Sequence, residues 1–138
     1  MKDRKRKILL IYPPSPVINR EDSCQQPTKD LLGIPQLPPT DLLYLAAIAE
    51  RCGFEAMVKD YSLGGNFVQD LKDFKPDYLL ANIAIPTFKS DMEAVAQAKN
   101  DAMNVLAPLG KKISAISNIN YGCSTFSNFS PYRNYVMK

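Results

Sequence analysis

The stretch KILLIYPP, residues Lys7–Pro14, decides the fold of this chain. Its first part is a short and mainly apolar run, which is typical of a strand buried on both faces of a parallel sheet. Pro13 and Pro14 then end the strand, because proline has no N–H group to donate to a neighbouring strand. The sequence therefore predicts a first strand over Lys7–Tyr12 with a loop directly after it.

A helix is expected over Asp41–Cys52. Thr40 can cap its start, and Gly53 suits the left-handed backbone position that ends a helix. Apolar residues recur every three or four positions and predict one face packed on the sheet, namely Leu42, Leu45, Ala46 and Ala49, widened by Leu43 and Ala47. The loop before this helix, Ser15–Pro39, is long and rich in proline. Long connections in compact domains are often functional, so this one is a candidate binding loop.

Two further strand–helix units follow. A second strand over Phe54–Lys59 ends at Asp60, and Asn66 is expected to cap a helix that stops at Lys75-Pro76. A third strand over Tyr78–Ile85 comes next. After Pro86 and Thr87, Ser90 and Glu93 form a capping-box pattern that opens another helix, with Met92, Val95 and Ala96 expected to face inward.

The pattern weakens after about Asn100. Asn104–Leu109 is expected to form a turn, and Lys112–Ser117 a fourth strand. The regular alternation of strands and helices predicts an α/β domain over residues 1–117, with an open parallel sheet of about four strands. One common doubly wound pattern gives the expected strand order 2-1-3-4. Residues 118–138 are expected to form an irregular tail.

Composition restricts the class of protein. A chain of 138 residues fits one domain with a real core, and its longest apolar runs are far shorter than a bilayer span. Cytoplasmic location, without contact to a membrane, is the expectation. The basic start, residues 2–7, could touch nucleic acid or anionic lipid, but a solvated terminus is favoured because no aromatic residues interleave with the cations. No nucleic-acid partner is expected.

Catalytic and metal-binding signals are missing from the sequence. The chain has no histidine, which excludes Ser–His–Asp and Cys–His catalysis. Its cysteines, Cys24, Cys52 and Cys123, are far apart and fit neither a disulfide framework nor a zinc site, and Cys52 is expected to be a small buried residue. Neither G-x-G-x-x-G nor a P-loop pattern occurs, so the usual nucleotide-binding signatures are absent.

Candidate binding residues follow the strands. In an open parallel sheet, ligands bind outside the carboxyl ends of the strands. Those ends carry Tyr12–Pro16, then Asp60-Tyr61-Ser62, then Pro86-Thr87-Phe88, and their groups suit hydrogen bonding to a polar ligand better than acid–base catalysis. For Asp60, capping a turn is an equal alternative to ligand contact. For Thr87 and Ser90, capping the third helix is favoured.

These motifs, in this order, resemble the amino-terminal cobalamin-binding domain of cobalamin-dependent radical S-adenosylmethionine (SAM) proteins. The similarity covers roughly residues 7–100 and is carried by short motifs at Lys7–Pro14, Pro39–Ala47, Cys52–Glu55, Asp60, Phe74–Asp77 and Pro86–Phe88. The resemblance implies a flavodoxin-like, Rossmann-like domain that holds a corrin at the carboxyl end of its sheet. By position, the matching cofactor-binding candidates are Pro13, Pro14, Ser15, Pro39, Asp60, Pro86 and Thr87.

The sequence departs from that family at several points. No D-x-H-x-x-G segment is present, so no histidine can ligate cobalt, and the sequence after Asn100 does not match, as in a truncated copy. No C-x-x-x-C-x-x-C iron–sulfur motif occurs, so the chain alone is not expected to be an enzyme. The expected function is cobalamin binding, with a separate radical SAM domain or chain as a partner. The alternatives are a non-catalytic remnant or partner-binding module, and a flavodoxin-like nucleotide or flavin binder.

Overall fold

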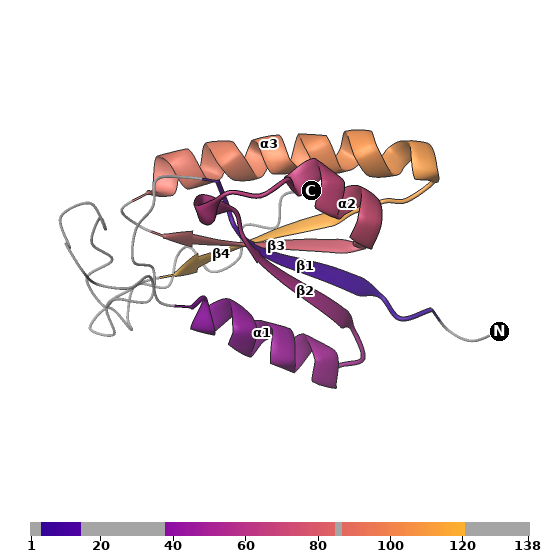
Figure 1. The fold of residues 1–138 in the computed structure, drawn as a ribbon, viewed down its shortest axis with the longest axis horizontal. Helices are drawn as coiled ribbons and strands as arrows, with labels where there is room; N and C mark the ends of the chain where they lie inside the picture. Colours follow the sequence, from indigo (N-terminus) through magenta and orange to yellow (C-terminus); the bar gives the residue numbers. More distant parts are fainter. Residues whose placement is uncertain (1–3, 15–37, 85–86, 121–138) are drawn as a thin grey trace.

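The structure is a computed structural model, and it describes residues 4–14, 38–84 and 87–120. Strands and helices alternate along the chain (Figure 1). The elements are β1 (Lys7–Tyr12), α1 (Thr40–Arg51), β2 (Glu55–Asp60), the short 3-10 helix η2 (Tyr61–Leu63), α2 (Phe67–Phe74), β3 (Tyr78–Ala84), α3 (Phe88–Leu106), the 3-10 turn η3 (Ala107–Leu109) and β4 (Ser114–Asn120). The expected α/β class is therefore confirmed.

The sheet is open and parallel. β1 lies in its middle, with β2 on one side and β3 on the other, and Leu9 aligns with Met57 and with Leu79 in these two pairings. β4 pairs in parallel with the outer edge of β3, from Tyr78 opposite Ser114 onward. The strand order is β2-β1-β3-β4, and helices connect the consecutive strands, as parallel pairing requires.

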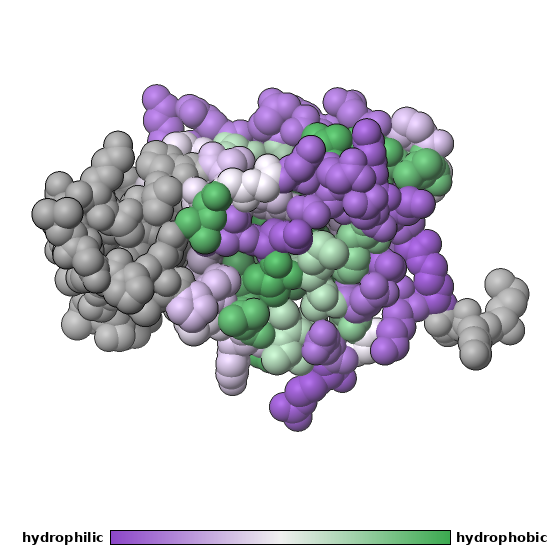
Figure 2. Space-filling view, in the orientation of Figure 1, coloured by the Kyte–Doolittle hydropathy of each residue, from purple (hydrophilic) through white to green (hydrophobic). Residues whose placement is uncertain are grey.

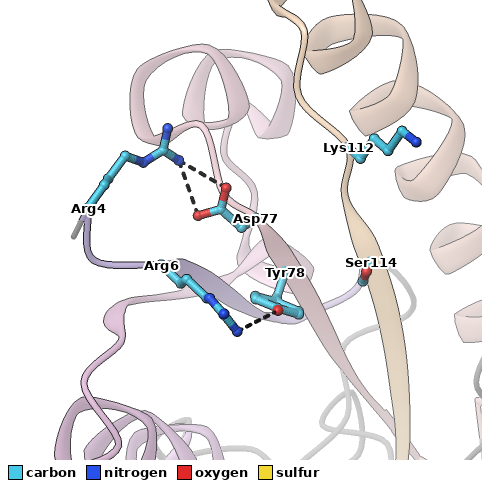
Figure 3. A pocket seen from close by; sticks show the side chains of 6 residues that line it. All are labelled: Arg4, Arg6, Asp77, Tyr78, Lys112 and Ser114. Carbon is cyan, nitrogen blue, oxygen red and sulfur yellow. Dashed lines mark hydrogen bonds and ion pairs between the residues drawn. The ribbon is translucent and has the colours of Figure 1, made fainter. Parts of the chain in front are cut away.

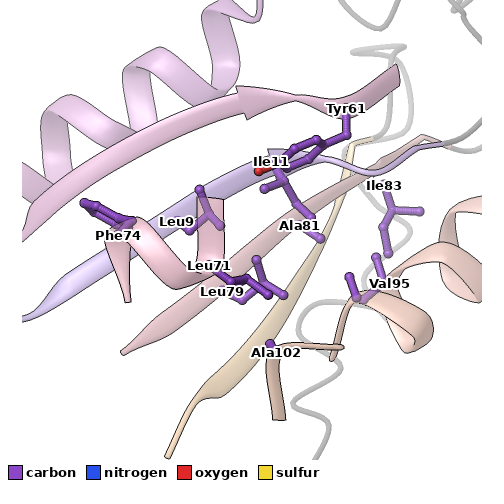
Figure 4. Close-up of a cluster of buried hydrophobic side chains, with 11 residues drawn as sticks. Leu9, Ile11, Tyr61, Leu71, Phe74, Leu79, Ala81, Ile83, Val95 and Ala102 are labelled. Carbon is purple, nitrogen blue, oxygen red and sulfur yellow. The ribbon is translucent and has the colours of Figure 1, made fainter. Parts of the chain in front are cut away.

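Helices cover both faces of the sheet (Figure 1). Since side chains alternate along a strand, Leu9 and Ile11 of β1 point to one face and Leu10 and Tyr12 to the other. The first pair joins the larger core under α2 and α3, shown in Figure 4, and the second pair joins a smaller core under α1. Leu9, Leu10 and Ile11 have no exposed surface, as expected for a strand buried on both sides.

The end of α1 and the start of α2 lie close to where the sequence predicts them. Gly53 has a φ of 87°, and Asn66 caps α2 by accepting a hydrogen bond from the Gln69 amide at 3.0 Å. α1, however, starts one residue earlier than predicted: Thr40 is its first helical residue, and Pro39 occupies the cap position. The prediction that Thr40 caps this helix was therefore wrong.

Leu43 and Ala47 do not widen the buried face of α1, contrary to the expectation. Leu42 and Ala46 are buried, whereas Leu43 is 48% exposed and Ala47 is also exposed. The reason is that α1 lies over β2 and β1, so only one stripe of the helix meets the sheet. Three large apolar side chains of α1 remain exposed, and Figure 2 shows a group of hydrophobic side chains in the lower region where α1 lies.

α3 is longer than its sequence pattern suggests. It begins at Phe88 with Thr87 as its cap residue, so Ser90 lies in the first turn and does not open a capping box. Ala96 is exposed, against the expectation, and the buried stripe continues instead through Ala98 and Ala102 to Leu106. The turn expected over Asn104–Leu109 is the end of this helix followed by η3.

β4 starts two residues later than the predicted Lys112 and runs to Asn120, beyond the expected strand end at Ser117. β3 ends at Ala84, and the predicted last residue of that strand, Ile85, lies outside the described residues. So does the remainder of the expected tail, 121–138. Among the helices that the structure describes, none is both long and apolar enough to cross a membrane.

Candidate functional site

The carboxyl edge of the sheet has a topological switch point between β1 and β3. From the central strand β1 the chain leaves through α1 on one face to reach β2, and from β3 it leaves through α3 on the other face to reach β4. Connections that leave neighbouring strands on opposite faces create a crevice at the carboxyl ends, where open α/β sheets bind their ligands. α1 and α3 both begin at this edge (Figure 1).

Asp41, in the first turn of α1, ties this region together on the α1 face. Its carboxylate accepts hydrogen bonds from the Tyr12 hydroxyl, from the Asn82 side-chain amide and, at 2.7 Å, from the backbone amide of Leu42. Tyr12 is 3% exposed and Asn82 is 1% exposed. The contacts therefore join the ends of β1 and β3 to the start of α1 in a partly buried polar network.

Asp91 has the same role at the start of α3. Its carboxylate has no exposed surface and accepts hydrogen bonds from the Ala84 amide and the Thr87 hydroxyl, both at 2.9 Å. The Ser90 hydroxyl donates to the Thr87 carbonyl at 2.9 Å, which closes the first turn. The end of β3 is thus fixed to the positive end of the α3 dipole, where a carboxylate is favourable.

Asp60, the last residue of β2, caps the turn that follows. Its carboxylate accepts hydrogen bonds from the Ser62 amide at 3.0 Å and from the Ser62 hydroxyl at 2.5 Å. Tyr61 is buried and its hydroxyl donates to Asp70 at 2.7 Å. Burial, and then the hydrogen bond and negative charge of Asp70, raise the pKa of Tyr61 far above its usual value. Of the two alternatives for Asp60, the geometry favours the turn cap.

The other predicted site residues differ in accessibility. Pro13 is fully buried and Thr87 is 8% exposed, with its hydroxyl bonded to Asp91. Pro14 is exposed and Pro39 is half-buried, so these two offer surface at the carboxyl edge. Ser15 and Pro86 lie outside the described residues. Five of the seven candidates therefore lie at strand or helix ends. Most of their side chains are buried or hydrogen-bonded within the protein and so stabilise the edge of the sheet rather than face a ligand.

The described residues of this edge offer apolar surface, at Pro14 and Pro39, for noncovalent contact with a ligand. Within residues 4–14, 38–84 and 87–120, no group of three potential metal-ligating side chains is present. The carboxylates of Asp41, Asp60 and Asp91 are all engaged with donors on their own or neighbouring elements. Their arrangement holds loops in place and is not that of a general acid–base pair.

The amino edge of the sheet is basic and contains two cavities in the described region. One, of about 250 Å³, is lined by Arg4, Arg6, Asp77, Tyr78, Lys112 and Ser114 (Figure 3). The other, of about 340 Å³, is lined by Arg4, Lys5, Arg6, Cys52, Gly53 and Phe54. Cys52 is exposed, so the expectation that it is buried was wrong. It follows the end of α1, where the chain turns away from the core.

Sequence reasoning named Asp60 and Thr87 as possible caps. It did not identify Asp41 or Asp91 at the carboxyl edge, nor Asp77 at the amino edge. Asn82, a polar residue inside an otherwise apolar strand, was the available signal for the carboxyl edge. For the amino edge the signal was the basic run before β1. That run contacts Asp77 and Tyr78 because β3 lies beside β1 in the sheet. The local sequence does not predict this neighbourhood.

Comparison with known proteins gives no match: no protein family, no curated protein and no solved structure is significantly similar to this chain.

Proposed function

We propose that this chain is a flavodoxin-like domain that binds a corrinoid cofactor of the cobalamin type at the carboxyl edge of its sheet. The observation that carries the proposal is the switch point between β1 and β3, where α1 and α3 begin. A parallel sheet with this order binds its ligand at such a point. The sequence resemblance to cobalamin-binding domains of radical SAM proteins narrows the ligand class.

The described residues offer apolar surface for contact with a corrinoid ring, and the chain offers no histidine ligand for its cobalt. Pro14 is an exposed apolar surface at the end of β1, and Pro39 offers partial surface at the start of α1. The buried networks of Asp41 and Asp91 keep the supporting backbone in place. No histidine occurs in the chain, so the protein offers cobalt no imidazole. The proposed binding therefore rests on contacts with the ring and its amide side chains.

Retention of hydroxocobalamin through gel filtration tests the ligand class. The purified protein should elute together with the visible absorbance of the corrin. A colourless protein peak would reject the corrinoid assignment. A protein peak that carries a flavin after incubation with flavin mononucleotide, and no corrin, would favour the flavodoxin-like nucleotide binder instead.

A pair of variants tests the position of the site. Pro14→Glu places a carboxylate at the proposed edge, where a bound ring would desolvate it, so corrin retention should fall strongly. Leu109→Glu, at an exposed position at the end of η3, is the matched control and should leave retention unchanged. Equal loss in both variants would mean that the corrin does not bind at the carboxyl edge.

Association with another chain is a second candidate, favoured by the exposed apolar residues of α1. Leu43, Tyr44 and Ile48 are 48%, 71% and 45% exposed. We propose self-association through this helix as the simplest form. Sedimentation analysis should show a dimer that Ile48→Asp dissociates, while Val68→Asp on α2 does not. A monomer at every concentration would reject self-association through α1.

A further inference from the structure

The smaller cavity at the amino edge of the sheet combines residues from the starts of three strands. Arg4 and Arg6 precede β1, Asp77 precedes Tyr78 at the start of β3, and Lys112 lies just before Ser114 at the start of β4. The segment before β1 and the start of β3 are more than seventy residues apart in sequence. The parallel sheet brings them together with the start of β4. This edge is opposite to the proposed corrinoid site and independent of it.

Asp77 neutralises one side of the cavity. Its carboxylate receives both hydrogen bonds from one nitrogen of Arg4, at 2.9 and 3.2 Å, and the Lys7 amide at 2.8 Å. Lys111 adds an ion pair at 3.4 Å. The single acidic residue in the wall is therefore already matched by cations, and the other cations of the cavity are left in excess.

Arg6 has donors to spare. In the described part of the chain its guanidinium makes one polar contact, a long hydrogen bond of 3.5 Å to the Tyr78 hydroxyl (Figure 3). A guanidinium has five donors, and a bidentate pair with a phosphate or carboxylate is its strongest mode of binding. Since the Tyr78 hydroxyl accepts from Arg6, its own proton is free to point to an anion.

The Tyr78 ring is held in position, which prepares the cavity for a ligand. It packs edge-to-face on Phe54, with ring centroids 5.6 Å apart. Ser114 is its partner on β4, so its hydroxyl lies beside Tyr78 on the neighbouring strand. Lys112 lines the cavity through its stem, and its ammonium points away from Arg6 in Figure 3. Its flexible side chain supplies charge and no fixed contact.

We propose that this cavity binds the phosphate group of a small phosphorylated molecule, with Arg6 as the main ligand and Tyr78 and Ser114 as hydroxyl donors. The volume of about 250 Å³ is below the usual range for pockets that enclose a drug-sized ligand. It therefore suits a phosphate or pyrophosphate group, with the remainder of the molecule outside. A phosphate fits better than a monocarboxylate because the excess of cations favours a dianion.

Titration of the isotope-labelled protein with orthophosphate and pyrophosphate, followed by NMR, tests this proposal. Saturable shifts are expected at the backbone amides of Arg6, Tyr78 and Ser114, and they should weaken as salt rises. Arg6→Gln should reduce affinity by about tenfold or more, and Arg6→Lys should give an intermediate value, because it keeps the charge but loses the fork. Lys89→Gln removes one exposed charge on α3 and should change affinity by less than about twofold.

Asp77→Asn gives a test of opposite sign. Removing the acidic charge frees Arg4 and Lys111, so phosphate should bind more tightly than to the wild type. The proposal is overturned if shifts do not saturate, if Arg6→Gln binds as well as Lys89→Gln, or if Asp77→Asn weakens binding. A nucleoside monophosphate should bind like orthophosphate. Much tighter binding of a short single-stranded oligonucleotide would reject a small ligand and indicate a nucleic-acid surface instead.

Discussion

The carboxylate of Asp91, at the start of α3, accepts a hydrogen bond of 2.9 Å from the backbone amide of Ala84, the last residue of β3. Both residues are buried, at 0% and 1% exposure. The bond ties the end of β3 to the first turn of α3, beside the switch point. The first turn of α3 thus has two roles. It anchors the end of β3, and it forms one wall of the proposed ligand site.

Asp91→Ala should destabilise the fold by about 2–3 kcal/mol, because the buried Ala84 amide and the Thr87 hydroxyl both lose their acceptor. Urea unfolding followed by circular dichroism measures the change. Glu93→Ala is the matched control, since Glu93 is an exposed acidic residue of the same helix, and it should stay within about 0.5 kcal/mol of the wild type. Equal stability of the two variants would contradict the assigned role of Asp91.

Tyr12 and Asp41 should be energetically coupled. Each of Tyr12→Phe and Asp41→Ala breaks the hydrogen bond that joins β1 to α1, so the double variant should lose less stability than the sum of the two. A coupling of about 1 kcal/mol is expected for residues in one buried network. Tyr61→Phe serves as the control because Tyr61 packs in the core on the other face of the sheet. Its cycle with Asp41→Ala should be additive.

The core strands were predictable because their signals are local, whereas the expected sheet order came from the general pattern of doubly wound sheets. The run before Pro13 gave the bounds of β1 directly, and alternating strands and helices fix parallel pairing. Helix limits were less predictable. The first turn of α3 begins at Phe88 because Asp91 bonds back to the end of β3, and this contact outweighs the capping pattern of Ser90 and Glu93.

The candidate site was predictable in position but not in detail. Strand ends in a parallel sheet must meet at one edge, so Pro14, Asp60 and Thr87 all lie there. Which side chains remain accessible depends on packing that sequence does not record. Asp60 and Thr87 satisfy neighbouring backbone and side-chain groups, whereas Pro14 is left exposed.

Lys75 offers a route to a more stable domain. It ends α2 with a φ of 52° and ψ of 60°, a left-handed conformation in which a side chain is strained. Lys75→Gly should raise stability by about 0.5–1 kcal/mol, since the relief of strain exceeds the entropy that glycine adds to the unfolded chain. Lys75→Ala removes the same side chain but keeps the Cβ atom, so it should give no such gain. Thermal unfolding of both variants measures the difference.

Asp77 should make the stability of the domain depend on pH. Partial burial acts to raise the pKa of Asp77, but the Lys7 amide and the charges of Lys111 and Arg4 outweigh it, so the pKa lies below its ordinary value of 3.8. A lowered pKa in the folded state stabilises the fold fully above pH 3.8, and this contribution is lost as pH falls through the lower, folded-state pKa. Asp77→Asn, which keeps an acceptor for the Lys7 amide, should therefore be less stable than the wild type at neutral pH, and this difference in stability should disappear in acid.

Asp73→Asn removes an equal charge from an exposed position on α2 and is the control. Urea unfolding over a pH series checks the result, and a gap that persists well below pH 3.8 would mean that Asp77 acts through packing and not through its charge.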